Sequence, residues 1–162
     1  MIKVAELKDL PSIMKLVARV INQVAGTPES AWNINYPNQE IIANDIRSQA
    51  LYVYQEKTIQ GIITLTGDTE EYSMISWKYS SGPFLVLHRL CVDPQHQGTG
   101  IAKRLITFAE DMAKEKGCES LQLDIYPYNS KARNLYEQHG FIYAGTMSRP
   151  NRGKFLCYEK PL

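Results

Sequence analysis

The chain has 162 residues, of which 44% are hydrophobic, and a formal net charge of +1 at pH 7. This length and composition are typical of a globular core, so we expect residues 1–162 to form a single domain. A net charge so close to zero gives no reason to expect nucleic-acid or membrane binding. The three cysteines, Cys91, Cys118 and Cys157, lack paired spacing, which predicts reduced thiols in a cytoplasmic protein and no metal site.

The first part of the chain predicts a short strand and two helices. Residues 2–5 are typical of a strand, and Asp9 would cap a helix that holds Pro11 in its first turn. Apolar residues then recur at helical spacing, at Ile13, Leu16, Val17, Val20 and Val24. A second helix is predicted over residues 39–49, after a loop that contains Trp32 and Tyr36.

The middle of the chain predicts strands. β-Branched and aromatic residues at 51–54 and 59–66, joined by a short polar turn, indicate a hairpin. Residues 84–92 form a long apolar run that predicts another strand. The segment 67–82 leaves two alternatives open, because its alternation would suit a strand extension and its composition would suit a loop.

The strongest helical pattern in the chain covers residues 98–116, and Gly117 is suited to end that helix. Its apolar stripe consists of Ile101, Ala102, Leu105, Ile106, Ala109, Met112 and Ala113. Strands are predicted at 121–125, 141–146 and 155–159, with a short helix capped by Asn129 or Ser130 in between. The predicted order is therefore β-α-α-β-β-β-α-β-α-β-β, a mixed α/β sheet.

The joint between the strand at 84–92 and the helix at 98–116 is the most informative stretch. It reads Gln95-His-Gln-Gly-Thr-Gly, so two glycines precede the start of a strong helix. A helix N-terminus presents free backbone N–H groups and the positive end of the helix dipole, which suit a phosphate or pyrophosphate. A dinucleotide fingerprint would need glycine or alanine where Lys103 stands, and a Walker loop would need Gly-Lys-Ser/Thr, so neither fits. The remaining alternative is a glycine pair that only turns the chain.

These residues resemble the signature of the GNAT superfamily of N-acetyltransferases. Its central motif, Gln/Arg-x-x-Gly-x-Gly/Ala, is matched by Gln95, Gly98 and Gly100. A second motif, Asn-x-x-Ala-x-x-x-Tyr-x-x-x-Gly-Phe, is matched by Asn129, Ala132, Tyr136, Gly140 and Phe141. The resemblance implies a mixed, mostly antiparallel twisted sheet flanked by about four helices, with splayed fourth and fifth strands.

The resemblance also implies acetyl-CoA as cosubstrate and no metal. The main chain of Leu90, Cys91 and Val92 would pair with pantetheine like an added strand, so the Cys91 thiol is not expected to be catalytic. The Val92 N–H would stabilise the oxyanion that forms during acyl transfer. The pyrophosphate would be held by the amides of one continuous run, namely Gln97, Gly98, Thr99, Gly100, Ile101 and Ala102.

Tyr136 is the proton donor that the resemblance implies. A phenol with a pKa of about 10 stays protonated beside a thiol with a pKa of about 8.5, so it would donate to the leaving thiolate. The alternative is a helix tyrosine that packs with Leu135 and Phe141. Asn129 would be a cofactor ligand or a helix cap, and both roles are compatible because capping uses only its amide oxygen.

The general base is the least constrained role. Many family members place Glu six residues before the position of Val92, where this chain has Val86. His88 matches a histidine of the arylalkylamine N-acetyltransferases, although the second histidine of those enzymes is replaced by Val86. An imidazole with a pKa of about 6.5 would relay an amine proton through water, so His88 is the candidate base. A structural histidine is the alternative, and Asp124 and Glu71 are weaker candidates.

The sequence therefore predicts an N-acetyltransferase that moves an acetyl group from acetyl-CoA to a primary amine of an unidentified small molecule or peptide. Direct attack in a ternary complex is expected. The alternatives are a non-catalytic acyl-CoA-binding or regulatory module of the same fold, a nucleotide-binding domain, and transfer of a longer acyl group. Aromatic residues would either line the acceptor site or close over the core, namely Trp32, Tyr36, Tyr72, Trp77, Tyr79 and Phe155. Many family members form homodimers, although nothing in this sequence specifies an interface.

Overall fold

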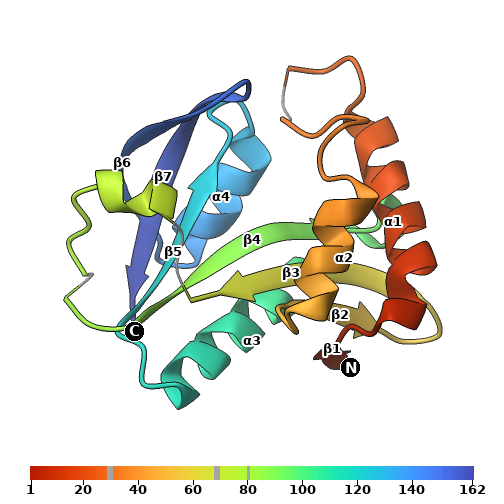
Figure 1. Ribbon diagram of the computed structural model, residues 1–162, viewed down its shortest axis with the longest axis horizontal. Helices are drawn as coiled ribbons and strands as arrows, with labels where there is room; N and C mark the ends of the chain where they lie inside the picture. Colours follow the sequence, from red (N-terminus) through yellow and green to blue (C-terminus); the bar gives the residue numbers. More distant parts are fainter. Residues whose placement is uncertain (29–30, 68–69, 80) are drawn as a thin grey trace. The chain divides into compact units, whose positions relative to one another are not determined.

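The computed structural model describes residues 1–28, 31–67, 70–79 and 81–162. Its strands are β1 (Ile2–Val4), β2 (Leu51–Gln55), β3 (Ile59–Thr66), β4 (Phe84–Val92), β5 (Ser120–Ile125), β6 (Ile142–Arg149) and β7 (Gly153–Pro161). Its α-helices are α1 (Leu10–Val24), α2 (Gln39–Arg47), α3 (Ile101–Glu115) and α4 (Ser130–Gln138). The predicted order of strands and helices is confirmed (Figure 1).

The strands form a seven-stranded sheet in the order β1-β2-β3-β4-β5-β7-β6. Antiparallel pairing joins β1 to β2, β2 to β3, β5 to β7 and β6 to β7, whereas β4 and β5 run parallel. The mixed, mostly antiparallel sheet is therefore confirmed. Among the described residues, the β4–β5 register covers Phe84 to Val86 against Ser120 to Gln122, which is the first part of a nine-residue β4.

The chain divides into two compact units, each assembled from separate segments. The first unit consists of Met1–Gly26, Trp32–Leu65 and His88–Ala109, and the second of Thr27–Ala31, Thr66–Leu87 and Glu110–Leu162. Strand β4 and helix α3 each begin in one unit and end in the other. Each unit has a hydrophobic core of its own.

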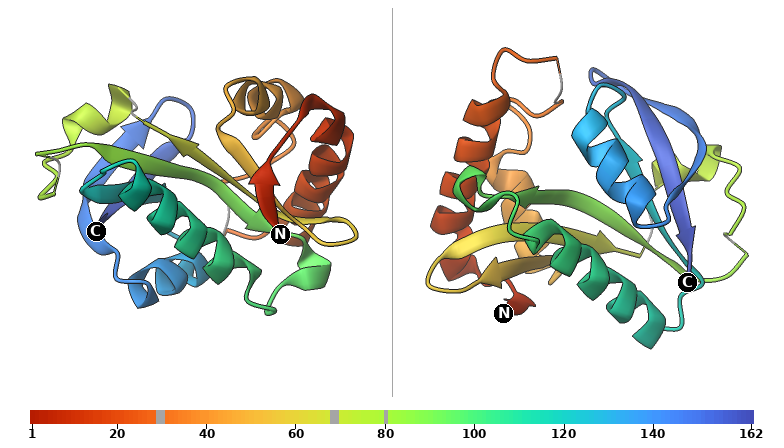
Figure 2. Two further views of the ribbon diagram at one scale, coloured as in Figure 1. Left: turned by 90° about the horizontal axis from the view of Figure 1, so that it is seen from below. Right: turned by 180° about the vertical axis from the view of Figure 1, so that it is seen from behind.

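The core of the first unit lies between its helices and the inner strands. Buried side chains of α1 and α2, such as Leu16 and Ile42, pack with Val53 of β2 and Ile62 of β3 (Figure 1). This arrangement explains the helical spacing of apolar residues in α1, because that stripe faces the strands. Helix α3 packs against β3 at Gly61, on the side opposite α1 and α2 (Figure 2).

Gly61 is required by the close approach of α3 to β3. A Cβ added there would lie 3.0 Å from Ile101 Cγ2, 3.1 Å from Leu105 Cδ1 and 3.3 Å from the Cys91 carbonyl oxygen. We expect Gly61→Ala to lower the free energy of unfolding by about 1–3 kcal/mol through overpacking. Gly67→Ala is the matched control, because a Cβ at Gly67 meets no heavy atom within 4 Å. Urea denaturation measures the unfolding free energy of each variant, and equal values for the two variants would contradict this packing.

The core of the second unit gathers on one face of β4, β5, β6 and β7. It consists of the buried residues Tyr72, Val86, Met147, Phe155 and Cys157. Tyr72, Ile75 and Trp77 of the connection between β3 and β4 pack at this cluster. A 3-10 turn at Glu70–Met74 shows that a strand extension there is wrong, whereas positions 68, 69 and 80 of the predicted segment lie outside the described residues. The reason is tertiary, because the Tyr72 hydroxyl donates to Asp124 at 2.7 Å and the Trp77 indole N–H donates to the Tyr72 carbonyl at 2.8 Å. Tyr72 and Phe155 therefore serve as core residues.

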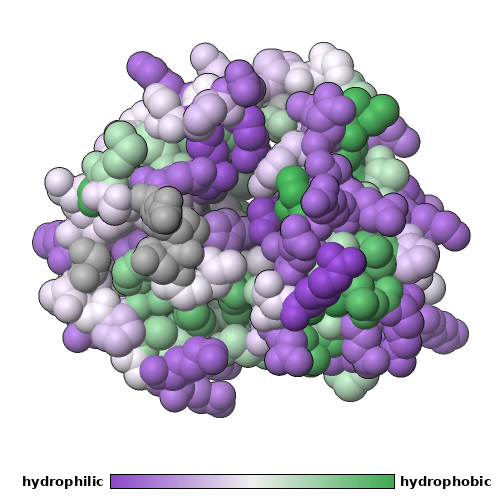
Figure 3. All heavy atoms as spheres, viewed as in Figure 1, coloured by the Kyte–Doolittle hydropathy of each residue, from purple (hydrophilic) through white to green (hydrophobic). Residues whose placement is uncertain are grey.

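The surface is mostly hydrophilic over the helices of the first unit. In Figure 3, polar side chains interleave with a few apolar ones over α1 and α2. This matches the amphipathic pattern that predicted both helices. Within the residues that the structure describes, no helix combines the length and the apolar character needed to cross a membrane.

Candidate active site

Most of the predicted site residues lie on one continuous stretch of the first unit. His88, Leu90, Cys91 and Val92 belong to the last part of β4, which ends at Val92. A single 3-10 turn, Pro94–His96, follows, and Gln97 to Gly100 connect it to α3. Ile101 and Ala102 are the first residues of that helix. The predicted strand–loop–helix joint is therefore confirmed.

The two glycines of the loop hold conformations that favour glycine. Gly98 has φ of 79° and Gly100 has φ of 89°, both in the left-handed region. A Cβ added at either position would meet no heavy atom within 4 Å, so the surface over both glycines is open. Ile101 is buried directly after them. The loop thus combines exposed amides with a helix start fixed in the core, and this arrangement fits a pyrophosphate.

Helix α1 is joined to the start of the loop by an ion pair between Arg19 and Asp93. The Asp93 carboxylate accepts from the Gln95 N–H at 3.1 Å and pairs with the Arg19 guanidinium at 2.6 Å. Burial alone would raise the pKa of Asp93, but the hydrogen bonds from Arg19 and Gln95 outweigh it and lower that pKa below its ordinary value. This carboxylate therefore stays charged at neutral pH and holds the turn against α1.

A second anchor joins the loop to β4. The Gln97 side-chain amide donates to the Val92 carbonyl oxygen at 3.1 Å, and Gln97 and Gln23 exchange side-chain hydrogen bonds at 3.0 and 3.1 Å. The end of β4 and the loop are thus fixed relative to each other by a side chain of the loop itself. The sequence analysis assigned Gln97 only a main-chain role and missed this contact.

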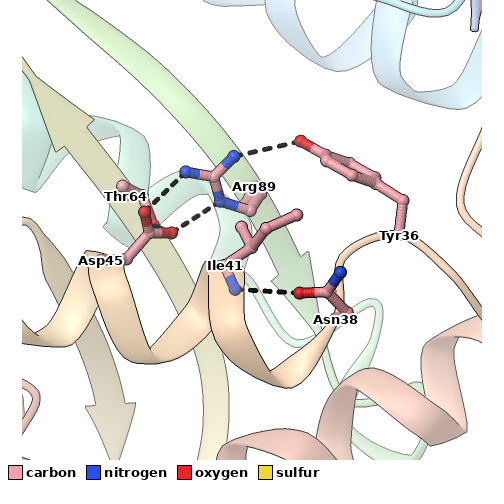
Figure 4. Close-up of polar contacts among 6 residues, drawn as sticks. All are labelled: Tyr36, Asn38, Ile41, Asp45, Thr64 and Arg89. Carbon is pink, nitrogen blue, oxygen red and sulfur yellow. Dashed lines mark hydrogen bonds and ion pairs between the residues drawn. The ribbon is translucent and has the colours of Figure 1, made fainter.

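Arg89 is a buried charge in β4 that the sequence analysis also missed. Its guanidinium donates to both carboxylate oxygens of Asp45 at 2.6 and 2.8 Å and to the Tyr36 hydroxyl at 3.0 Å (Figure 4). Burial lowers the pKa of Arg89, but the hydrogen bonds and charge of Asp45 outweigh it, so the pKa is raised. A charged residue inside an apolar run was the available signal, although its partner lies 44 positions away.

The cysteines are not arranged as nucleophiles. Cys91 and Cys157 are buried. Burial raises the pKa of Cys91, and burial together with the Asp124 charge raises the pKa of Cys157 to about 12. Because the thiolate is the reactive form, neither supports an acetyl-cysteine intermediate.

We expect iodoacetamide at about pH 8 to modify the half-buried Cys118 of the native protein and to spare Cys91 and Cys157. Mass spectrometry of the digested protein measures the modification at each position. In guanidinium chloride all three should react. Native labelling of Cys91 as fast as that of Cys118 would contradict the burial of its thiol.

Tyr136 lies on α4 and Asn129 directly precedes that helix, both in the second unit. The Asn129 side-chain oxygen accepts from the Ala132 N–H at 3.1 Å, so the capping role is confirmed. The Tyr136 ring is buried and packs edge-on against Phe141, with ring centroids 5.5 Å apart. Gly140 ends the helix with φ of 86°, which directs Phe141 back onto the tyrosine. The second motif is therefore a helix with its cap, its stop and a packed aromatic pair.

The weaker base candidates are engaged within the second unit. Asp124 accepts from the Tyr72 hydroxyl and pairs with Arg149 at 2.6 Å, and Glu71 pairs with the same arginine at 3.3 Å. These carboxylates therefore belong to a structural network within that unit. Across the described ranges, no group of three or more His, Cys, Asp or Glu side chains is arranged to hold a metal ion.

The structure is an α/β fold in which a loop with two left-handed glycines, Gly98 and Gly100, leads directly into α3. Comparison with known proteins identifies the family and supports the fold. The profile of the Acetyltransferase (GNAT) family matches residues 18–141, and the chain belongs to this family. A Streptococcus agalactiae acetyltransferase of the GNAT family has the same fold, with a TM-score of 0.83 and 22% identity over 100% of this chain and 95% of that one.

Two further acetyltransferases are similar to this chain. The PaiA N-acetyltransferase of Thermoplasma acidophilum, solved in complex with coenzyme A, has a TM-score of 0.72 and 20% identity over 100% of this chain and 98% of that one. Bovine thialysine N-epsilon-acetyltransferase is 32% identical over 69 residues, 43% of this chain and 39% of the relative. The chain thus spans about two fifths of the length of that curated relative.

Proposed function

We propose that this protein is an acetyl-CoA-dependent N-acetyltransferase that acts on a primary amine of a small molecule or peptide by direct attack in a ternary complex. Residues 1–162 would form one acetyltransferase domain, since β4 and α3 belong to both compact units. We place the activity in the cytoplasm, with support from the three free cysteines.

The glycine loop carries this proposal. Its two left-handed glycines leave open surface over the amides at the start of α3, and Gln97 ties the same loop to the end of β4. A pyrophosphate on the amides of Gln97 to Ala102 would bring the rest of coenzyme A alongside β4. The main chain of Leu90, Cys91 and Val92 would then pair with pantetheine, and the side-chain N–H₂ of Asn129 would contribute a further donor.

Bound acetyl-CoA supplies the acetyl thioester, and the protein supplies protons and hydrogen bonds. His88 would accept a proton from the ammonium group through water, because only the neutral amine attacks. The Val92 N–H would donate to the carbonyl oxygen as negative charge develops on it. Tyr136 would donate its hydroxyl proton to the departing sulfur. No metal has a part in these steps.

Two measurements test the proposal. In a thermal-shift assay, the melting temperature should rise with coenzyme A and stay unchanged with NAD or ATP, because the loop lacks both nucleotide fingerprints. Release of the coenzyme A thiol from acetyl-CoA should then depend on an added amine from a panel of small amines, amino acids, polyamines and short peptides. Binding without amine-dependent thiol release across the panel would favour the non-catalytic acyl-CoA module, and the absence of binding would overturn the site.

A further inference from the structure

Strand β4 contains a strained residue directly before its proposed ligand-binding stretch. Three residues other than glycine hold positive φ in the described chain, namely Gln49, Arg89 and Asn151. Gln49 follows the C-cap of α2 and Asn151 lies in the β6–β7 turn, where left-handed residues are common. Arg89, with φ of 47°, lies inside a strand. Such a conformation is strained and persists only where the surrounding structure over-determines it.

The Arg89 side chain is held by residues from two other segments. Its guanidinium is held by Asp45 of α2 and by Tyr36 of the segment before α2, and the Thr64 hydroxyl of β3 donates to the same Asp45 at 3.0 Å (Figure 4). The Arg89 and Asp45 side chains are only 13% and 12% exposed. Removing one partner of so enclosed an ion pair leaves the other charge uncompensated. The clamp, defined by Arg89, Asp45 and Tyr36, therefore fixes the side chain of the left-handed residue.

Arg89 directly precedes the part of β4 that is proposed to bind the acyl donor. A left-handed residue in a strand turns the peptide planes that follow it away from the regular pleat. The next residues are Leu90, Cys91 and Val92, whose main chain is assigned above to the acyl donor. We propose that Arg89 is a positioning residue, whose side chain is held by Asp45 and Tyr36 so that β4 directs its N–H groups toward the thioester. This inference rests on the proposed function and adds the device that orients its hydrogen-bond donors.

Loss of the clamp should lower turnover more than it weakens cofactor affinity. Asp45→Asn keeps the shape of the side chain and removes its charge. We expect kcat to fall roughly tenfold to a hundredfold, because a small misplacement of a reacting group has effects of this size. The Kd for coenzyme A should rise by a smaller factor than kcat falls, because the pantetheine contacts of β4 are disturbed while Asp93 and Gln97 still anchor the pyrophosphate loop. A Kd that weakens in parallel with kcat would overturn the positioning role.

Two substitutions at Arg89 separate the backbone from the charge. Glycine adopts a left-handed conformation without strain, whereas valine resists it most strongly. We therefore expect Arg89→Gly to retain several times more turnover than Arg89→Val, although neither carries a guanidinium. Equal kcat values in the two variants would overturn the proposal. Tyr36→Phe removes a single hydrogen bond, so it tests the clamp with a smaller fall in kcat even where an Arg89 variant fails to fold.

Glu110→Gln is the matched control. The Glu110 carboxylate pairs with Lys160 at 2.6 Å and is 15% exposed, so the substitution removes a comparably enclosed charge that has no proposed part in the reaction. We expect this variant to keep wild-type kcat, and circular dichroism should show native folding in every protein compared. If the wild type neither binds coenzyme A nor releases thiol, the proposed function itself fails. If the wild type is active and the clamp variants match it in kcat, this inference alone fails.

Discussion

Tyr136→Phe should lower kcat by about 100-fold while leaving the Kd for coenzyme A unchanged. Removal of a general acid has effects of this order, and a donor to the departing sulfur acts mainly in the transition state. The variant keeps the ring that packs edge-on against Phe141, so the fold of α4 should be preserved. Steady-state kinetics on acetyl-CoA and the best amine of the panel, together with calorimetric titration of coenzyme A, measure the two quantities.

A second buried tyrosine provides the control for this experiment. The Tyr158 hydroxyl donates to Glu137 at 3.0 Å, and the residue is buried in the same unit. Tyr158→Phe therefore removes an enclosed phenol hydroxyl that has no proposed part in the reaction. We expect it to keep wild-type turnover. If Tyr136→Phe also turns over at the wild-type rate, Tyr136 has only a packing role.

Gly98→Ala should weaken coenzyme A binding by about 10-fold to 100-fold. A side chain at this position would occupy the open surface over the loop and disfavour φ of 79°. The loss corresponds to about one charge-assisted hydrogen bond to the pyrophosphate, which contributes roughly 1.5–3 kcal/mol. Calorimetric titration of coenzyme A measures the change directly, and Gly98→Val should enlarge it.

Gly117→Ala separates backbone strain from ligand contact. Gly117 ends α3 with φ of 73° and also has no heavy atom within 4 Å of an added Cβ. Both alanine variants should therefore lose a similar unfolding free energy, about 1–2 kcal/mol. Only the Gly98 variant should lose affinity. Equal weakening of coenzyme A binding in the two would mean that strain, rather than the pyrophosphate contact, explains the result.

Sequence periodicity predicted the elements well where the pattern is local. The apolar stripe of α3 follows the period of one helix, and the stop at Gly117 follows from the left-handed backbone at its end. The glycine loop could also be predicted from sequence, because its positive-φ positions favour glycine at fixed offsets from the helix start. The second motif could be assigned for the same reason, since its cap and its stop belong to a single short helix.

Features that depend on distant partners were not predictable in this way. The Arg89–Asp45 pair joins residues 44 positions apart, and no local pattern signals which carboxylate meets which guanidinium. The 3-10 turn at Glu70–Met74 depends on the burial of Tyr72 against β5. Asp9 was expected to cap α1 with its side chain, but that carboxylate accepts from the Glu6 N–H at 2.9 Å in the preceding turn instead.

Because β4 contributes Cys91 to the core of the first unit and Val86 to the core of the second, neither core can melt while the other keeps its full set of partners. A cavity-forming change around Phe155, remote in sequence from the glycine loop, would therefore reduce the cellular abundance of the whole protein. Genetic screens that score only growth or product yield would rank such alleles together with true active-site losses. Measuring protein level alongside yield would separate the two groups.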